Sequence, residues 1–388
     1  MNSFTSNSDA YRRYVLWLLI CTGTPIAILF TIGIYLQPLF GDLTRIGFYS
    51  ERDFGWQGFQ YTFPQHRLNV DAHLTDLKTP VDILILGDSF SRERPEYQWQ
   101  NYLMAQHPVS ILTMDINHTD IHHVLTSRNY RLHPPRILII ESVERQLPQH
   151  LLNIAADCSA NHQAEMQPSA AMAIWTLAYP PFSSSRSTSW PLININFVLK
   201  YLEHSFQLTS NPSPSVYALP LSTDRLFSNQ HAKTLLVFGD DVRKPEWKKQ
   251  PLSSLNCRIE SLRRQVEANG STRFVLMVAP DKLTAYTPWL ASKAPQNRSQ
   301  LAWLSAQHPQ TMPRLDLELQ HAIGSGQRDV YFPDDTHWGW KGHQIAAMTL
   351  MKFLDHGLAR PPTLPTKPST SPIKHPSTPR TSATLQSP

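Results

Sequence analysis

The sequence predicts an α/β fold, a three-layer sandwich in which a parallel, flavodoxin-like sheet lies between two layers of helices. Short, uninterrupted apolar runs rich in Val, Ile and Leu recur along the chain, and such runs are typical of strands buried on both faces. Segments with apolar residues at helical spacing separate several of these runs. Because strand and helix alternate, we expect parallel βαβ units with a ligand crevice at the carboxyl ends of the strands.

Five runs are the predicted strands, at residues 81–86, 109–114, 136–140, 234–238 and 273–278. A helix is predicted between the first two runs, at residues 95–106, and a shorter helical segment containing Val124 and Leu125 follows the second run. Two longer helices are predicted at residues 254–268 and 341–354, because apolar side chains there fall on one helical face.

An apolar stretch near the N-terminus predicts a membrane anchor. Residues 14–37 contain no charged side chain, and at about 1.5 Å per helical residue the stretch is long enough to cross a hydrocarbon core. Arg12 and Arg13 directly precede it, so residues 1–13 are expected in the cytoplasm and the rest of the chain outside. A cleaved signal peptide is the alternative, but the stretch exceeds a usual signal and no Ala-x-Ala site follows it.

The composition divides the remainder of the chain into three parts. Residues 38–79 are polar and aromatic without periodicity, and we expect a stalk or cap there. Residues 80–358 are the expected catalytic domain, with an insertion at about 148–231 that is rich in loop signals. Residues 359–388 contain mainly Pro, Ser, Thr and Lys, a composition that predicts a disordered basic tail. The net charge of +5 shows no clustered basic face, so nucleic-acid binding is not indicated.

Two short motifs supply the residue types of a nucleophilic triad. Gly87–Phe90 directly follows the first apolar run, which puts Ser89 at the rim of the predicted sheet, and Asp334–Trp338 contains a histidine next to two carboxylates. A serine hydroxyl needs a base to take its proton, and the base needs a carboxylate to fix its tautomer. We therefore expect Ser89 as the nucleophile and His337 as the base. The local alternative is a strand-ending turn and a pair of helix-capping aspartates.

Taken together, the Gly87–Ser89 and Asp335–Trp338 motifs resemble those of the SGNH (GDSL-type) hydrolase superfamily. The Asp-Thr-His-Trp form is similar to the SGNH-like domain of the alginate O-acetyltransferase group, whose members acetylate exopolysaccharides outside the bacterial cytoplasm. In some of these members the Asp-x-His motif precedes the serine motif, whereas here it follows. The resemblance implies the SGNH fold and favours Asp335 as the partner of His337. Asp334 is the rival, because the wider superfamily spaces the two residues by three.

The resemblance covers roughly residues 80–355 and implies a membrane-anchored O-acetyltransferase that modifies a polysaccharide through an acyl-enzyme on Ser89. It further implies a single-pass protein of the bacterial inner membrane with its catalytic domain in the periplasm. Since acetyl-CoA is cytoplasmic, the expected acetyl donor is a membrane-bound acyltransferase. Two alternatives stay open, a carbohydrate esterase with the same triad and a non-catalytic polysaccharide-binding or assembly protein.

Several other residues are candidates for the site or for its support. The amide of Ser89 is one expected oxyanion donor, and Asn117, just past the second strand, is a candidate for another. Trp338 is expected as a core aromatic beside the site, with sugar stacking as the alternative. Three charged residues follow the third strand: Glu141, Glu144 and Arg145. They are expected either to form a structural ion pair or to line the site.

No metal or cofactor is expected. His118, His122 and His123 could share a helical face, but no carboxylate or cysteine completes a ligand set with them. A Gly-rich phosphate loop is not present in the sequence, so no nucleotide is implied. Cys158 and Cys257 are either joined by a disulfide, which an external compartment permits, or are two unpaired thiols.

Overall fold

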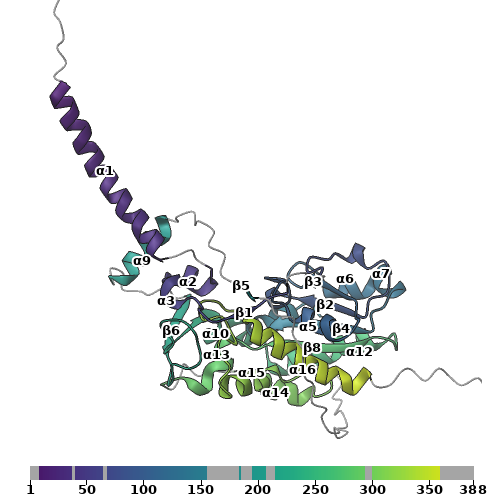
Figure 1. The fold of residues 1–388 in the computed structure, drawn as a ribbon. Helices are drawn as coiled ribbons and strands as arrows, with labels where there is room; N and C mark the ends of the chain where they lie inside the picture. Colours follow the sequence, from purple (N-terminus) through teal and green to yellow (C-terminus); the bar gives the residue numbers. More distant parts are fainter. Residues whose placement is uncertain are drawn as a thin grey trace, which may run out of the picture.

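The computed structural model describes residues 8–36, 40–63, 68–154, 183–184, 195–206, 215–292 and 299–358 of the 388-residue chain. Helix α1 (Ser8–Leu36) extends away from an α/β body, and α9 (Ile195–Ser205) packs beside its carboxyl end (Figure 1). The predicted tail at residues 359–388 and Cys158 lie outside the described residues, whereas Cys257 is disulfide-bonded.

The body is organised around a four-stranded parallel sheet. Its strands are β2 (Ile83–Gly87), β3 (Ile111–Asp115), β4 (Ile137–Val143) and β8 (Arg273–Ala279), in the order β3-β2-β4-β8. Numbered along the chain, this order is 2-1-3-4, which matches the first four positions of the flavodoxin-like order. The four corresponding runs of the sequence therefore predicted the strands and the parallel α/β class correctly.

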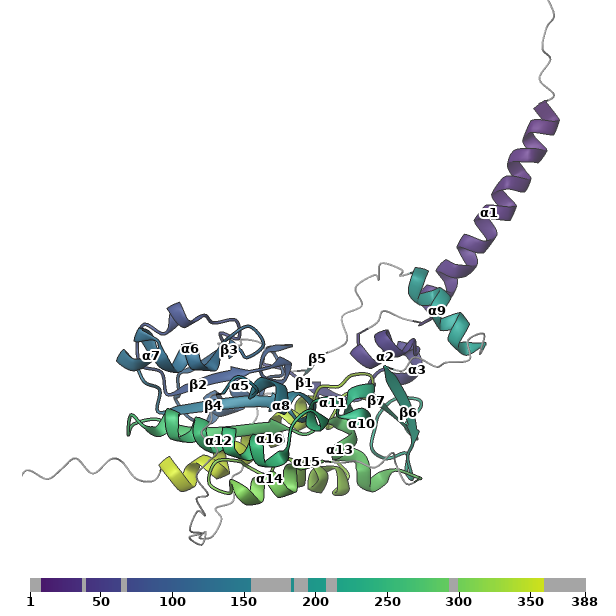
Figure 2. The same ribbon diagram turned by 180° about the vertical axis from the view of Figure 1, so that it is seen from behind.

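Both faces of this sheet are covered by apolar side chains. Successive residues of a strand point to opposite faces, so Ile83 and Ile85 pack into one buried cluster while Leu84 and Leu86 pack into another. The first cluster includes side chains of α5 (Trp99–Gln106), α15 (Leu315–Gly324) and α16 (Trp340–Leu358). The second includes side chains of α6 (Ile121–Thr126), α7 (Arg128–Leu132), α12 (Leu252–Glu267) and α14 (Leu301–Gln307). Figure 2 shows the ribbons of these four helices from behind. The predicted helices at 95–106, 124–125, 254–268 and 341–354 are confirmed in α5, α6, α12 and α16.

One predicted strand does not join the parallel sheet. Strand β7 (Thr234–Phe238) instead pairs antiparallel with β6 (Val216–Pro220) in a separate two-stranded sheet, so its assignment to the central sheet was wrong. Its run is apolar for another reason. Leu235 packs into the first buried cluster, while Leu236, on the other face of the strand, packs against Leu43. A continuous apolar run reports burial on both faces and does not identify the neighbouring strand.

The segment that follows α1 is folded against the body. It contains α2 (Asp42–Gly47) and α3 (Glu51–Phe54), and its strand β1 (Gln60–Tyr61) pairs antiparallel with β5 (Ser183–Ser184). From the sequence, only a stalk or cap was predicted for this region. Within the insertion the structure describes α9, and most of residues 155–214 lie outside the described part of the chain.

Short elements complete the described fold. They are η1 (Leu74–Asp76), α4 (Ser89–Arg92), η2 (Glu144–Gln146), α8 (Leu147–His150), α10 (Gly239–Arg243), α11 (Pro245–Lys248), α13 (Lys282–Tyr286) and η3 (Thr287–Trp289).

Helix α1 has the length and composition of a membrane span. Within Asp9–Leu36, the most apolar stretch has a mean hydropathy of 2.2 and none of that stretch is buried in the protein; among the described residues this is the one helix of that kind. Its carboxyl end nevertheless contacts the body, because Leu36 is buried and the Arg52 guanidinium lies 4.1 Å from the centroid of the Tyr35 ring. Whether α1 crosses a bilayer stays a prediction.

Burial of Leu43 tests whether the segment after α1 is an integral part of the folded body. Leu43 is fully buried with Val216 and Leu236, so Leu43→Ala should lower the free energy of unfolding by about 3 kcal/mol. The control is Leu132→Ala, since the Leu132 side chain is 60% exposed. Chemical denaturation of the detergent-solubilised protein measures both. Equal midpoints for the two variants would mean that α2 does not stabilise the body.

Candidate active site

The turn after β2 presents Ser89 at the carboxyl edge of the sheet. Asp88 caps α4, and its carboxylate accepts hydrogen bonds from the amides of Phe90 at 3.0 Å and Val143 at 2.6 Å. Gly87 is required by close packing, because a Cβ there would lie 2.7 Å from the Ser91 Cβ. Asp88 therefore shapes the turn and leaves Ser89 half-buried at its tip.

A buried carboxyl group supports this turn from below. Glu141 Oε2 accepts hydrogen bonds from the Asp88 amide at 3.1 Å and from the Ser91 hydroxyl at 2.8 Å. Burial, together with the charge of Asp88, raises the pKa of Glu141 well above its usual value. These effects favour the neutral acid form of Glu141, and its two hydrogen bonds hold the turn that carries Ser89.

Ser89, His337 and Asp335 form one chain of hydrogen bonds, although Ser89 and His337 are 248 positions apart. The Ser89 Oγ and His337 Nε2 are separated by 2.7 Å, and the His337 Nδ1 and Asp335 Oδ1 also by 2.7 Å. The Asp335 Oδ1 accepts a second bond from the His337 amide at 3.1 Å. These contacts hold the imidazole with Nδ1 toward the carboxylate and Nε2 toward the hydroxyl.

Asp334, the rival for the acid, has a different environment. Its main-chain carbonyl accepts hydrogen bonds from the amides of Leu43 at 2.9 Å and Thr44 at 3.3 Å, both in α2. Asp335 is the aspartate whose carboxylate is bonded to His337. The sequence alone could not separate these two neighbours, and the preference for Asp335 rested on the resemblance.

The charges around the triad favour the ionic forms that proton transfer needs. Burial by itself raises the pKa of Asp335, but the charge and hydrogen bonds of His337, with the charge of Arg94, outweigh burial and hold that pKa below its usual value. Burial likewise lowers the pKa of His337, but Asp335 and, less strongly, Glu93 raise it above its usual value. These charges therefore stabilise an imidazolium at His337, the form that a base reaches on accepting a proton.

Lys282 holds the loop that carries Asp335 and His337. Its Nζ donates to the main-chain carbonyls of Phe332 at 2.7 Å, Pro333 at 2.9 Å and Asp335 at 3.0 Å. Burial lowers the pKa of Lys282 to about 7, against the attraction of the Asp334 and Asp335 carboxylates. Three acceptors match the three hydrogens of the ammonium form. The sequence analysis did not identify this role of Lys282.

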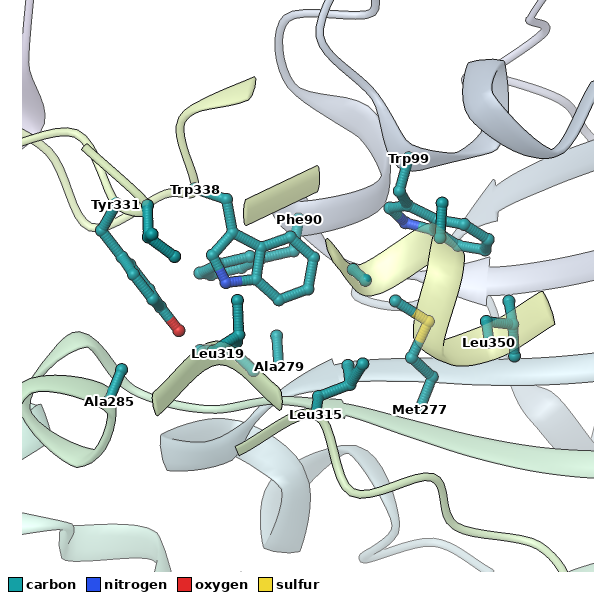
Figure 3. Packing of buried hydrophobic residues seen from close by; sticks show 14 of the residues in the cluster. Phe90, Trp99, Met277, Ala279, Ala285, Leu315, Leu319, Tyr331, Trp338 and Leu350 are labelled. Carbon is teal, nitrogen blue, oxygen red and sulfur yellow. The ribbon is translucent and has the colours of Figure 1, made fainter. Parts of the chain in front are cut away.

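Trp338 lies in the protein core behind the site. Its ring is fully buried, and it packs edge-on against Phe90, with centroids 4.8 Å apart, and near Tyr331 and His343 (Figure 3). A fully buried ring offers no face to a sugar. The expectation of a core aromatic is therefore correct, and the alternative of sugar stacking is not supported.

The expected oxyanion donors differ in their availability. The Ser89 amide makes no hydrogen bond with any described residue, so it is free to donate to a developing oxyanion. Asn117 is engaged elsewhere, because its side-chain nitrogen donates to Asp115 at 3.2 Å and its side-chain oxygen lies 3.1 Å from His150 Nε2. The role of Asn117 stays a prediction without a supporting contact to the triad.

The charged residues after β4 form structural ion pairs with later parts of the chain. Glu144 pairs with Lys244 at 2.9 Å, and Arg145 pairs with Asp241 at 3.2 Å and Asp281 at 3.4 Å. All five groups are largely or fully buried at the carboxyl edge of β4 and β8. This network confirms the structural alternative for Glu144 and Arg145, whereas Glu141 supports the Ser89 turn.

Among the described residues, three side chains at the triad lie close enough together to share a metal ion. Ligand atoms of Asp42, Glu93 and His337 lie within 4.8 Å of one another. Both ring nitrogens of His337 are already hydrogen-bonded, to Ser89 and Asp335. A cation at this position would therefore compete with the contact between serine and histidine, and no catalytic step is assigned to one.

Comparison with known proteins supports the resemblance drawn from the motifs. Residues 235–378 match the family described as an SGNH hydrolase-like domain, acetyltransferase AlgX. This region contains Lys282, Asp335 and His337, covers less than half of the 388 residues, and does not include Ser89. No curated protein and no solved structure matches the chain.

The raised pKa of His337 predicts the pH dependence of a serine-based reaction. His337 must be neutral to accept a proton, so kcat/KM should fall as the pH drops through this raised pKa. Glu93→Gln removes one of the charges that raise it, and its acidic limb should move to lower pH. Glu260→Gln on α12 is the control and should not move the limb. Superimposable profiles for both variants and the parent would contradict the assigned role of His337.

Removal of Lys282 should damage both stability and turnover. Lys282→Met leaves three carbonyls of the triad loop without their donor, at a cost on the order of 3 kcal/mol. We expect a lower unfolding midpoint and a lower kcat for the fraction that remains folded. Lys248→Met, at an exposed position of α11, is the control. If the two variants behave alike in both measurements, Lys282 does not hold the loop.

Proposed function

We propose that this protein, whose residues 235–378 resemble the SGNH hydrolase-like domain of AlgX, is an O-acetyltransferase that modifies a polysaccharide outside the cytoplasm. The observation that carries the proposal is the hydrogen-bonded chain of Ser89, His337 and Asp335 at the carboxyl edge of the parallel sheet. A hydroxyl, an imidazole and a carboxylate in this arrangement are equipped for acyl transfer through a covalent intermediate.

The reaction runs in two half-reactions of the same kind. Ser89 Oγ attacks the carbonyl carbon of an acetyl ester while His337 Nε2 takes the hydroxyl proton, and the donor alcohol leaves with that proton as the acetyl group stays on Ser89. A sugar hydroxyl then attacks the acetyl-serine and gives its proton to His337, which returns it to Ser89 Oγ. The free Ser89 amide supports the oxyanion of each tetrahedral intermediate.

The proposed location follows from α1 and the residues before it. If α1 spans the bilayer, Arg12 and Arg13 set the N-terminus in the cytoplasm, so the α/β body lies in the periplasm as part of a single-pass inner-membrane protein. A membrane-bound acyltransferase is the proposed acetyl donor and the polysaccharide is the acceptor. We also propose that the body is a complete three-layer SGNH sandwich.

An esterase is the second candidate, and one observation favours it. Ser89 is only half-buried, and the Glu93 side chain, whose carboxylate lies 3.8 Å from His337 Nε2, is 54% exposed. Water can therefore reach an acetyl-serine unless the acceptor excludes it. A non-catalytic polysaccharide-binding protein would not need the hydrogen bond between Ser89 and His337.

A direct assay separates these functions. The full chain in detergent is incubated with a nitrophenyl acetate ester, with and without oligosaccharides, and free acetate and acetylated sugar are measured. A transferase yields acetylated sugar at the expense of acetate, whereas an esterase yields acetate alone across the acceptors.

Ser89→Ala should remove the activity by a factor of about a thousand or more while leaving the unfolding midpoint close to that of the parent. The reason is that the hydroxyl forms the covalent bond but contributes little to the core. The control is Ser253→Ala, at an exposed position of α12. Undiminished acetyl transfer in Ser89→Ala would rule out the proposed mechanism.

A further inference from the structure

We propose that Arg94 is a positioning residue of the triad, and that the segment Phe40–Thr44, directly after α1, holds Arg94 and the triad loop in place. Arg94 contacts the acid of the triad and acts through it. This role rests on the proposed function, because it concerns the same site.

Arg94 and His337 each bind a different oxygen of the Asp335 carboxylate. Its Nη2 donates to Asp335 Oδ2 at 2.8 Å, while Asp335 Oδ1 is bonded to His337. With each oxygen held by a different partner, the carboxylate cannot rotate without breaking one of the two contacts. The Arg94 side chain is 20% exposed and Asp335 is buried, so their attraction is only partly screened by water.

The backbone of Arg94 is held in an uncommon conformation to make this contact. Its φ is 54°, in the left-handed region that residues other than glycine seldom occupy. Its carbonyl accepts a hydrogen bond from the Tyr97 amide at 2.9 Å, which stabilises the turn. Such conformations cost free energy and persist where the surrounding structure holds them, most often at functional sites.

Two aromatic rings enclose the guanidinium. Its central carbon lies 4.6 Å from the centroid of the Phe40 ring and 5.0 Å from that of Phe332. The Phe40 carbonyl also accepts a hydrogen bond from Arg94 Nη2 at 3.1 Å. A planar guanidinium suits this position, because it can stack on rings and donate two bonds at once, which an ammonium group cannot do in the same way.

The same segment also binds the backbone of the triad loop. The amides of Leu43 and Thr44 donate to the Asp334 carbonyl at 2.9 Å and 3.3 Å. Gly41 allows this approach, since a Cβ there would collide with that carbonyl. The loop before His337 is thus held on one side by Lys282 and on the other by the segment after α1.

The test compares Arg94→Met with Arg92→Met in the full chain. Arg92 lies in the same turn, is similarly exposed at 24%, and is also paired with carboxylates, those of Asp71 and Asp115, which are outside the triad. Hydrolysis of a nitrophenyl acetate ester gives kcat and KM as functions of pH. Thermal unfolding is followed alongside, and the pKa of His337 is measured by NMR.

Arg94→Met should lower kcat by about tenfold or more, in line with other residues that orient a catalytic group, with KM little changed. The pKa of His337 should rise, because the positive charge of Arg94 lowers it in the parent. Arg94→Lys should recover part of kcat, and Arg92→Met should change neither quantity. If Arg94→Met fails to fold, Phe40→Ala, which keeps the guanidinium but removes one ring, should lower kcat in the same manner by a smaller factor.

Two results would overturn the inference: an unchanged kcat and His337 pKa in Arg94→Met, or an equal loss in Arg92→Met. Failure of the proposed function has a separate signature, because Ser89→Ala would then retain the hydrolysis seen in the parent. The NMR measurement of His337 does not depend on turnover and therefore decides the role of Arg94 in either case.

Discussion

The hydrogen bond between His337 and Asp335 depends on a loop without regular structure, and the rest of the site serves to hold that loop still. Residues 332–337 form turns and bends between Tyr331 and Trp338, which make an isolated β-bridge. Because these residues are in neither a helix nor a strand, few of their carbonyls have a regular backbone hydrogen-bond partner. Lys282, at the start of α13, supplies three hydrogen bonds, and α2 supplies two more. Burying an ammonium group is costly, and it is tolerated here because its hydrogens all find carbonyl acceptors.

The sheet explains why these parts meet at all. In a 2-1-3-4 order the chain leaves β2 and returns to strands on either side of it, so the crevice opens at the carboxyl end of β2. Ser89 lies there, β4 contributes Glu141, and Asp281 follows the end of β8. The polar residues at this edge are buried and paired with one another, so the turn that carries Ser89 is supported by fixed contacts.

Much of this arrangement was predictable from the sequence, for reasons that differ between its parts. The strands β2, β3, β4 and β8 were visible because buried parallel strands are continuous apolar runs, and α12 and α16 because their apolar residues repeat at helical spacing. The two triad motifs were visible because serine, histidine and aspartate leave a recognisable local pattern.

Several features were not predictable, because each depends on contacts between residues distant in the chain. They are the partner of β7, the folding of the segment after α1, and the roles of Arg94 and Lys282. A lysine or arginine at such a position has no local signature, and β7 has the same composition whether its neighbour runs parallel or antiparallel.

The close fit of Phe40, Gly41 and α2 against the triad loop also decides where the chain can be shortened. A water-soluble version that began at the first strand of the parallel sheet would keep Ser89, His337 and Asp335, yet it would strip the ring from one side of Arg94 and leave the Asp334 carbonyl without its amide donors. The boundary that removes α1 and spares the site lies between Leu36 and Phe40.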